Sequence, residues 1–481
     1  MSIENIRQFI KVKSQEFGGI PEIDFIERNN TKDDAFDKGG AYFGIISSEE
    51  EHSGPYHDFS IVLFPGKEIN RPWIIALGIG SLGFKNDYEL ASFPGLRRLF
   101  SKIIDSNGYV KSDFSDIENG LPKEFFGRED ISHLRKAIDN SKGYGKVLSA
   151  VQVLENPESD KSKDCISAFL AIYSKIRNWN WKSEYTKAIT KTLEPYLNSV
   201  EFDISTDLLN LLNERKYIVI QGPPGTGKTR VAKQVAEKLG AEIYFTQFHA
   251  ETSYSDFIFG LRPKTNSEIL SYEINKGEFS KAVEFALKDE NKTKKVILVI
   301  DEINRANLSN VLGPIFYLFE HKMDITNVEI EISPILKIKE LPKNFYVIAT
   351  MNTADRSLAV VDFALRRRFA WYDLKPTPIK GKKKKLETLA VIELANSKGY
   401  FFCEDYAAIC EIFDWYATSN ELSLQPGQGY FIADSKEEMT NRIKYEIFPL
   451  IKEYLQEGLI KSAKEEFNNY FATRINKSLF E

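Results

Sequence analysis

Short, almost continuous runs of apolar residues characterise the second half of the chain. They occupy residues 217–220, 295–300, 345–350 and 370–374, and helical spacing of apolar residues follows the first run at 230–236. Strands buried on both faces of a parallel sheet have this composition, whereas half-exposed strands alternate polar and apolar residues. The pattern therefore predicts an α/β domain built on a parallel sheet.

The first part of the chain has a different pattern. Apolar residues have helical spacing at 2–13 and 96–104, and three apolar runs at 41–46, 58–64 and 72–78 are bounded by glycine, proline and asparagine. Runs with such boundaries are typical of strands. We expect a mixed α+β domain here.

The length of 481 residues is too great for one hydrophobic core, and the patterns predict four regions. These are an N-terminal α+β domain at 1–145, a helical connector at 146–200, the α/β domain at 201–378 and a helical region at 379–481. Alternating apolar residues also predict a β-hairpin within 324–339.

A glycine-rich loop directly follows the first buried run and directly precedes the helical pattern. The backbone N–H groups of such a loop surround a triphosphate, its lysine reaches the β- and γ-phosphates, and its last threonine binds Mg²⁺. The flanking strand and helix are the context that this motif requires. The predicted phosphate-binding residues are Gly222, Pro223, Pro224, Gly225, Thr226, Gly227, Lys228 and Thr229.

Polar residues end the next two buried runs. Asp301 and Glu302 follow the run at 295–300, and Asn352 follows the run at 345–350. The carboxyl ends of parallel strands are where open α/β sheets bind ligands. We expect Asp301 to hold Mg²⁺, Glu302 to orient or deprotonate the attacking water, and Asn352 to hydrogen-bond that water or the γ-phosphate.

Three arginines precede the last predicted strand. Arg366, Arg367 and Arg368 are candidates for a side chain that stabilises transition-state charge across a subunit boundary, because a guanidinium is planar and always ionised. The alternative is a basic helix end that stabilises its own carbonyl groups.

Several segments give the chain a family resemblance. Residues 301–307, 351–357 and 358–369 resemble the McrB motor subunit of modification-dependent restriction systems, an AAA+ NTPase that hydrolyses GTP. Segments between 247 and 263 are also similar to that family. The resemblance implies an AAA+ P-loop core with a helical C-terminal lid, Asp355 in the nucleotide site, Mg²⁺ as cofactor, and GTP as substrate with ATP as the alternative.

The same resemblance implies partners. They are further copies in a ring, expected to be a hexamer, DNA that carries methylated bases, and an McrC-like nuclease. Cutting is assigned to that nuclease because the chain shows no recognisable nuclease pattern.

The lid departs from the family pattern. The family tends to carry Gly-His-Ser-Tyr-Phe, whereas residues 427–431 read Gly-Gln-Gly-Tyr-Phe. A nucleotide-sensing role for the missing imidazole is therefore in question, although the amphipathic run at 443–451 still predicts a lid helix.

Composition bears on three properties: membrane contact, zinc binding and a basic surface for DNA. The chain lacks a run of about 20 apolar residues and a signal pattern at its N-terminus, so we expect a cytoplasmic protein without membrane contact. Cys165, Cys403 and Cys410 have no paired spacing, which argues against zinc. The net charge of −5 indicates that a generally basic DNA-binding surface is absent.

Two features of uncertain role remain. The aromatic residues Tyr42, Phe43, Tyr56, Phe59 and Trp73 could line a pocket for a base turned out of DNA, but core packing is the commoner role of such residues. The lysine-rich run at 380–385 could contact DNA, but such runs are usually solvated loops.

Two other function classes stay open. One is an ATP-driven AAA+ remodeller whose N-terminal domain binds a protein, which suits the low net charge. The other is a nucleotide-gated scaffold with slow turnover, which Glu302 argues against because a scaffold needs no activating carboxylate.

Overall fold

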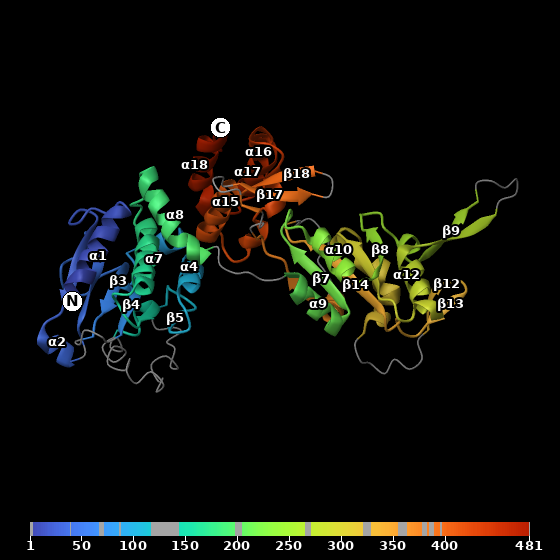
Figure 1. Cartoon of the computed structure of the whole chain (residues 1–481), viewed down its shortest axis with the longest axis horizontal. Coiled ribbons are helices and arrows are strands. Elements are labelled where there is room, and N and C mark those ends of the chain that lie inside the picture. The colour runs from blue at the N-terminus through green and yellow to red at the C-terminus, as the bar shows by residue number, and fades with distance from the viewer. Residues whose placement is uncertain are drawn as a thin grey trace. The chain divides into compact units, whose positions relative to one another are not determined.

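The computed structural model describes most of the chain and divides it into two compact units. Described are residues 3–38, 40–66, 72–85, 88–116, 144–197, 204–264, 271–320, 329–354, 363–377, 382–383, 389–394 and 397–480. The first unit comprises residues 1–200, 411–419 and 458–466, and the second comprises 201–410, 420–457 and 467–481 (Figure 1).

The N-terminal unit is built on a six-stranded antiparallel sheet with the order β1-β2-β3-β4-β6-β5. The strands are β1 (Phe25–Asn30), β2 (Tyr42–Ser47), β3 (Phe59–Phe64), β4 (Trp73–Ile79), β5 (Gly108–Val110) and β6 (Leu148–Leu154). The three strands that the apolar runs predict are confirmed as β2, β3 and β4. The α+β class predicted for this part of the chain therefore holds.

Helices pack against one face of this sheet, as Figure 1 shows for α1 and α7. The helices of the unit are α1 (Ile3–Glu16), α2 (Asp33–Lys38), α3 (Tyr88–Ala91), α4 (Leu96–Ile103), α7 (Asp160–Ile176) and α8 (Ser183–Leu197). The helices predicted at 2–13 and 96–104 are confirmed as α1 and α4. The region at 146–200 is not a separate connector, because β6 pairs with β4 and β5 and α7 lies in the core of the unit.

The candidate pocket aromatics separate onto different surfaces. Phe43, Phe59 and Trp73 are buried in the core between sheet and helices, and the Phe43 and Trp73 rings meet edge to face at 5.7 Å. Tyr42 packs with the opposite face, since successive strand residues point to opposite sides. Tyr56 lies outside the strands, under the guanidinium of Arg28 at 5.1 Å. These five side chains do not line one pocket.

A segment from the C-terminal region completes the core of the N-terminal unit. Trp415 is fully buried in that core, and the Lys175 ammonium lies 4.5 Å from its ring. Arg98 Nη2 donates to the carbonyl oxygens of Asp414 and Ala417, both at 2.9 Å. The segment 411–419 is thus part of this unit in packing and in hydrogen bonding.

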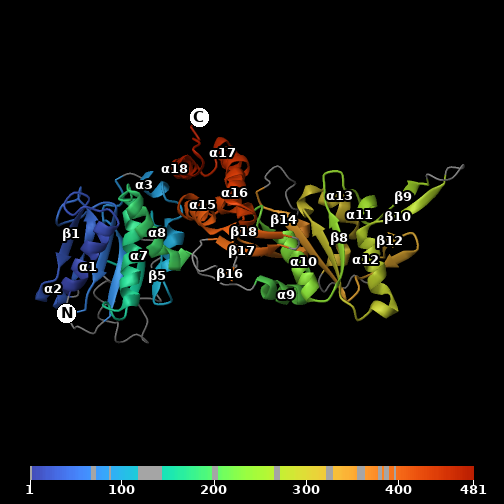
Figure 2. The ribbon, with the colours of Figure 1, turned by 45° about the horizontal axis from the view of Figure 1, so that its top comes forward.

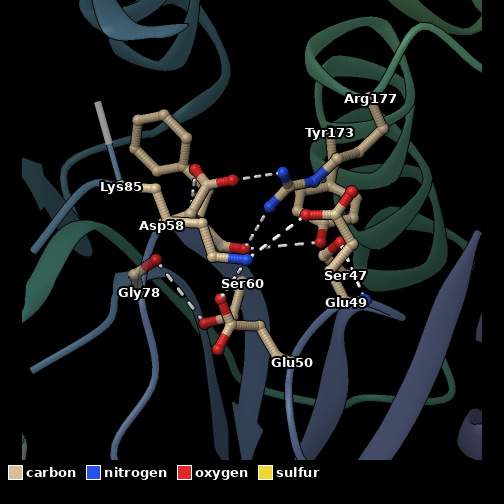
Figure 3. A network of polar contacts seen from close by, with 10 residues as sticks. Ser47, Glu49, Glu50, Asp58, Ser60, Gly78, Lys85, Tyr173 and Arg177 are labelled. Carbon is tan, nitrogen blue, oxygen red and sulfur yellow. Dashed lines mark hydrogen bonds and ion pairs between the residues drawn. The ribbon is translucent and has the colours of Figure 1, made fainter. Parts of the chain in front are cut away.

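A buried ion pair fixes the loop that enters β3 (Figure 3). Arg177 Nη1 donates to Asp58 Oδ2, and Arg177 Nη2 donates to the Phe59 carbonyl at 2.7 Å. The Tyr173 hydroxyl donates to the same carbonyl at 3.3 Å. Asp58 has a φ of 65°, a conformation that costs energy outside glycine and persists where such contacts hold it. The α7 end thereby anchors the loop before β3.

We expect Arg177→Ala to lower the free energy of unfolding of this unit by about 3–5 kcal/mol, because it leaves a buried carboxylate without its partner. Denaturant unfolding followed by tryptophan fluorescence measures the loss. Lys161→Ala is the matched control: the Lys161 side chain is 87% exposed and pairs with Asp105 at 3.2 Å, and losing that pair should cost at most about 1 kcal/mol. Equal effects of the two substitutions would contradict the assignment of Arg177 as an anchor.

The second unit contains a five-stranded sheet with the order β15-β7-β14-β11-β8, in which all neighbours are parallel. The strands are β7 (Tyr217–Gly222), β8 (Glu242–Gln247), β11 (Val296–Asp301), β14 (Phe345–Asn352) and β15 (Ala370–Asp373). The predicted parallel sheet and its four apolar runs are confirmed.

Helices cover both faces of the parallel sheet (Figure 2). Apolar side chains of α9 (Ile204–Arg215) and α10 (Lys228–Lys238) pack on one face, and those of α12 (Glu278–Leu287) and α13 (Leu308–Leu312) pack on the other. This burial explains why the strands read as continuous apolar runs. The short helices α11 (Tyr254–Phe257) and α14 (Phe363–Arg368) complete the layer arrangement.

Two hairpins are attached to this core. One pairs β9 (Phe259–Pro263) with β10 (Tyr272–Lys276) and projects from the body of the unit in both views. The other pairs β12 (Ile330–Ser333) with β13 (Leu336–Ile338), which confirms the hairpin predicted within 324–339.

The C-terminal part of the second unit is a lid that mixes helices with strands. A four-stranded antiparallel sheet, β16-β17-β18-β19, corrects the expectation of an all-helical region. The short runs at 389–394 and 400–402 are mostly apolar or aromatic and too short to show a helical period, and such runs suit strands. The lysine-rich run lies outside the described residues except for Lys382 and Lys383, which form β16.

The predicted lid helix is confirmed as a π-turn at Ile443–Ile447 followed by α17 (Phe448–Gln456). The remaining lid elements are β17 (Leu389–Leu394), β18 (Ser397–Phe402), α15 (Cys403–Tyr416), β19 (Ile432–Ala433), α16 (Lys436–Arg442) and α18 (Lys464–Ile475). The unit boundary falls within α15, between Cys410 and Glu411.

Candidate nucleotide site

Three strands of the parallel sheet bring the predicted site residues to one edge. β14 lies between β7 and β11, and Asn352 is in register with Gly222 at the carboxyl end of β7. Asp301 ends β11 at the same edge. Because parallel strands end together, residues far apart in the sequence meet here.

The loop after β7 has the conformation of an anion-binding nest. Gly225 and Gly227 have φ angles of +78° and +81°, which favour glycine. Gly227 precedes α10 without a side-chain cap, so N–H groups of the first turn remain available. Thr226 is buried and its hydroxyl donates to the Pro223 carbonyl at 2.9 Å, which closes the loop internally. Helix N-termini of this kind bind phosphate.

The ammonium group of Lys228 lies within this loop. It donates to the carbonyl oxygens of Gly222 at 3.0 Å and Pro223 at 2.8 Å, and to Asn352 Oδ1 at 2.6 Å. The side chain is buried, with 6% of the residue exposed. A buried charge requires such hydrogen bonds, and they fix the ammonium group beside the glycine-rich loop.

The Thr229 hydroxyl donates to Asp301 Oδ1 at 2.6 Å. The hydroxyl of Thr350, a residue that the sequence reasoning missed, donates to the same carboxylate oxygen at 2.6 Å. Magnesium is commonly held by one or two carboxylates together with substrate phosphates, so Thr229 and Asp301 fit Mg²⁺ in this place. The described residues contain no cluster of three or more His, Cys, Asp or Glu that would hold a metal by itself.

Glu302 is held beside the loop in a strained conformation. Its φ is 53°, in the left-handed region, and its N–H donates to the Thr350 hydroxyl at 3.2 Å. Asn352 Nδ2 donates to Glu302 Oε1, so one amide links the lysine to the glutamate. Strain of this kind is found where function fixes a side chain.

The second carboxylate oxygen of Glu302 is available for a reacting group. Oε2 is buried and has no hydrogen-bond partner among the described residues, while Arg305 Nε lies 3.4 Å away. Burial raises the pKa of Glu302, and the nearby Arg305 opposes that rise. A partly desolvated carboxylate with an open oxygen is suited to accept a proton from water.

We expect the hydrolysis rate to fall as pH falls through the pKa of Glu302, because the base must be ionised. Since burial raises that pKa, the acid limb of the pH–rate profile should lie above the ordinary glutamate pKa of about 4.3. Arg305→Ala removes the cation that lowers the pKa and should move the limb to higher pH. Lys292→Ala, which removes an exposed cation before β11, serves as control. An unchanged limb in Arg305→Ala would contradict this role of Glu302.

The three arginines differ in exposure. Arg368 is buried and pairs with Glu320, and the Arg367 side chain is 66% exposed while Nη2 pairs with the same glutamate at 2.8 Å. Arg366 is exposed, with its guanidinium 4.9 Å from the Trp371 ring. Glu320 was not predicted, since nothing in its sequence context marks it. Arg368 therefore has a structural role in its own subunit, whereas Arg366 and Arg367 face solvent.

The remaining predicted residues are placed as follows. Asp355 lies outside the described residues. The carbonyl groups of residues 224–226 point to the lid turn at 427–430, which the sequence marked only as a departure from a family pattern.

None of the helices in the described part of the chain is long and apolar enough to cross a membrane.

The glycine-rich loop, the acidic end of β11 and the polar end of β14 together have the arrangement of a P-loop nucleotide site. In agreement, residues 217–369 match the AAA domain family, dynein-related subfamily. The chain is also 42% identical over 202 residues to the McrB subunit of the Escherichia coli (strain K12) type IV methyl-directed restriction enzyme EcoKMcrB. Over this part, the chain is similar to McrB and to AAA domains.

The chain is also similar to another restriction component and, more weakly, to a solved structure. The YdiS component of the Bacillus subtilis (strain 168) type II restriction enzyme BsuMI is 29% identical over 191 residues. The Thermotoga maritima RuvB Holliday junction branch migration motor matches with 21% identity and a TM-score of 0.22, over 37% of this chain and 46% of that chain. The E. coli match covers 40% of this chain and 42% of the relative, and the B. subtilis match covers 32% and 55%. The chain thus spans about half or less of these curated relatives.

Proposed function

We propose that this chain is the nucleoside triphosphatase motor of an McrBC-like restriction complex, with GTP favoured over ATP. The observation that carries the proposal is the linked set of Lys228, Asn352 and Glu302 beside the Thr229–Asp301 pair. Hydrolysis of a triphosphate needs groups of these kinds close together, to position the phosphates, a magnesium ion and the attacking water, and this supports the proposal.

Each residue has a defined part in hydrolysis. The loop amides and Lys228 bind and orient the phosphates, while Thr229 and Asp301 would hold Mg²⁺. Magnesium, when bound, neutralises charge on the β- and γ-phosphate oxygens. Asn352 fixes Glu302 Oε1, so that Oε2 accepts the proton of the attacking water. Positioning and charge stabilisation supply most of the rate in this reaction class.

Assembly would complete the site. We assign the transition-state arginine to the exposed pair Arg366 and Arg367, because a group that acts on a neighbouring subunit must leave its own surface. A homo-oligomeric ring, which we propose to be a hexamer, places such a residue at each nucleotide. Hydrolysis would therefore depend on ring formation.

Arg367→Ala should lower the hydrolysis rate, whereas Arg368→Ala should lower the stability of the fold. Loss of a trans-acting arginine lowers the hydrolysis rate by about 10³–10⁵-fold without destabilising the subunit. Loss of the buried Arg368 leaves Glu320, with its side chain 11% exposed, to the single contact with Arg367 and should lower the unfolding temperature. Phosphate release and thermal unfolding of both variants, with Arg366→Ala beside them, identify the residue. A stable, fully active double variant Arg366→Ala/Arg367→Ala would exclude both.

The target and the partner are proposed from the relatives. The E. coli relative is a methyl-directed restriction subunit and the B. subtilis relative is a restriction component. We propose that the N-terminal unit binds DNA, with methylated bases as the modification, and that an McrC-like nuclease cuts. A second candidate is an ATP-dependent remodeller whose N-terminal unit binds a protein, which the net charge of −5 favours.

Steady-state phosphate release with GTP and with ATP tests the motor, each with and without an McrC-like partner. Glu302→Gln should lower the rate by about 10²–10⁴-fold while nucleotide still binds. GTP preference with stimulation by the partner supports the restriction motor. ATP preference without a response to the partner supports the remodeller.

Fluorescence anisotropy with methylated, unmethylated and single-stranded DNA tests the target. Binding to methylated DNA in preference to the other two supports the restriction reading. Failure to bind any of them at low salt would reject DNA as the target of the N-terminal unit, because non-specific phosphate contacts are strongest there.

A further inference from the structure

The lid turn, residues 427–430, contacts the backbone of the phosphate loop directly. Three consecutive carbonyl groups of the loop accept hydrogen bonds from three consecutive residues of the turn. These are Gly427 N to Pro224 O at 2.9 Å, Gly429 N to Gly225 O at 2.8 Å, and Gln428 Nε2 to Thr226 O at 2.8 Å.

The approach is close enough that both turn positions require glycine. A Cβ atom at Gly427 would lie 2.3 Å from the Gly225 carbonyl carbon, and one at Gly429 would lie 2.8 Å from the Gly225 oxygen. The requirement comes from space, since Gly427 has an ordinary φ of −73°. On the other side, a Cβ at Gly225 would meet the Tyr430 ring at 2.7 Å. The two backbones are therefore in contact without intervening side chains.

The orientation of the loop carbonyls decides where the loop N–H groups point. No peptide bond among the described residues is cis, and in a trans peptide the C=O and N–H bonds point in opposite directions. Because the carbonyls of residues 224, 225 and 226 face the lid turn, the N–H groups of 225, 226 and 227 face away from it. Those N–H groups are the donors that a phosphate-binding loop presents to its ligand.

Thr377 and Arg442 hold the lid turn in place through hydrogen bonds. Gln428 Oε1 accepts from the Thr377 N–H at 3.3 Å, which leaves Nε2 directed at the loop. Arg442 Nη1 donates to the carbonyls of Gly429 at 3.1 Å and Ile432 at 2.7 Å. The lid turn therefore supports the loop from a rigid base.

The two departures from the Gly-His-Ser-Tyr-Phe pattern act together. A serine at position 429 would bring its Cβ to 2.8 Å from the Gly225 oxygen, so the observed approach needs Gly429. That approach in turn lets the Gln428 amide reach Thr226. In this chain the contact of Gln428 with Thr226 therefore depends on glycine at position 429.

We propose that Gln428 is a positioning residue for nucleotide binding: with the glycines of the lid turn it sets the orientation of the phosphate-loop amides and so the affinity for the β-phosphate. The inference rests on the proposed function, in which this loop binds a nucleoside triphosphate. Movement of the lid would change the affinity for the phosphate groups of the nucleotide without requiring a change in contacts to its base or ribose.

The test is nucleotide affinity in the full-length protein. The probes are fluorescent GDP and ADP analogues, with inorganic pyrophosphate as a competitor that lacks a base. Gln428→Ala removes one hydrogen bond and should weaken all three ligands by about fivefold. Gln428→Glu, which is isosteric but places an acceptor against the Thr226 carbonyl, should weaken them further. Gly429→Ser should weaken them by about tenfold or more, because it forces the two backbones apart.

The pattern across ligands and kinetic constants separates this role from a loss of stability. The KM for hydrolysis should rise while kcat changes little, and diphosphate and pyrophosphate affinities should fall by the same factor. Gln425→Ala is the matched control, because that glutamine belongs to the same lid segment but its Nε2 donates to Cys410 Sγ at 3.0 Å. Its nucleotide affinities should equal those of the wild type.

Two outcomes would overturn the inference. If Gln428→Ala, Gln428→Glu and Gly429→Ser bind every probe within twofold of the wild type, the lid turn does not set phosphate affinity and the proposed function stands. If the wild type binds neither nucleotide nor pyrophosphate, the proposed function fails and this inference fails with it. Should Gly429→Ser not fold, the two variants of the half-buried Gln428 decide the matter.

Discussion

The buried ammonium group of Lys228 is the constraint on which the nucleotide site depends. A charge removed from water must find hydrogen-bond partners, and here they are two carbonyls of its own loop and the amide of Asn352. The amide can be present only because β14 lies between β7 and β11. The Nδ2 group of the same amide donates to Glu302, so the positions of Lys228 and Glu302 both depend on the order of the strands.

Much of this arrangement could be predicted from the sequence, because its signals are local. Continuous apolar runs indicate buried parallel strands, and residues directly after such strands must lie at one edge of the sheet. That rule alone predicts that three polar residues meet at this edge, namely Asp301, Glu302 and Asn352. Thr350 was not predicted as a site residue because a threonine inside an apolar strand has no distinguishing context, although its hydroxyl donates to Asp301. Which arginine is exposed depends on Glu320, a residue outside any motif.

Other features depend on contacts between distant segments and could not be predicted. The region at 146–200 begins with a strand, β6, whose partners β4 and β5 are fixed only by tertiary pairing. The aromatic residues of β2, β3 and β4 looked alike in sequence, but the two faces of the sheet separate Tyr42 from Phe43. The sequence of the lid turn showed only that the histidine of the family pattern is missing, and it did not reveal the backbone contact of the turn with the phosphate loop.

The presence of Trp415 in the core of the N-terminal unit limits how evolution can replace that unit by another domain. A fragment that ended at residue 200 would lack this indole and the carbonyl groups that Arg98 binds, leaving a large void and an arginine without those acceptors. The unit is therefore discontinuous along the chain, because its segments 411–419 and 458–466 come after the parallel sheet of the second unit. Replacing residues 1–200 by another domain in a single recombination event would disrupt the core of the unit, so its evolution is tied to that of the C-terminal segment at 411–419.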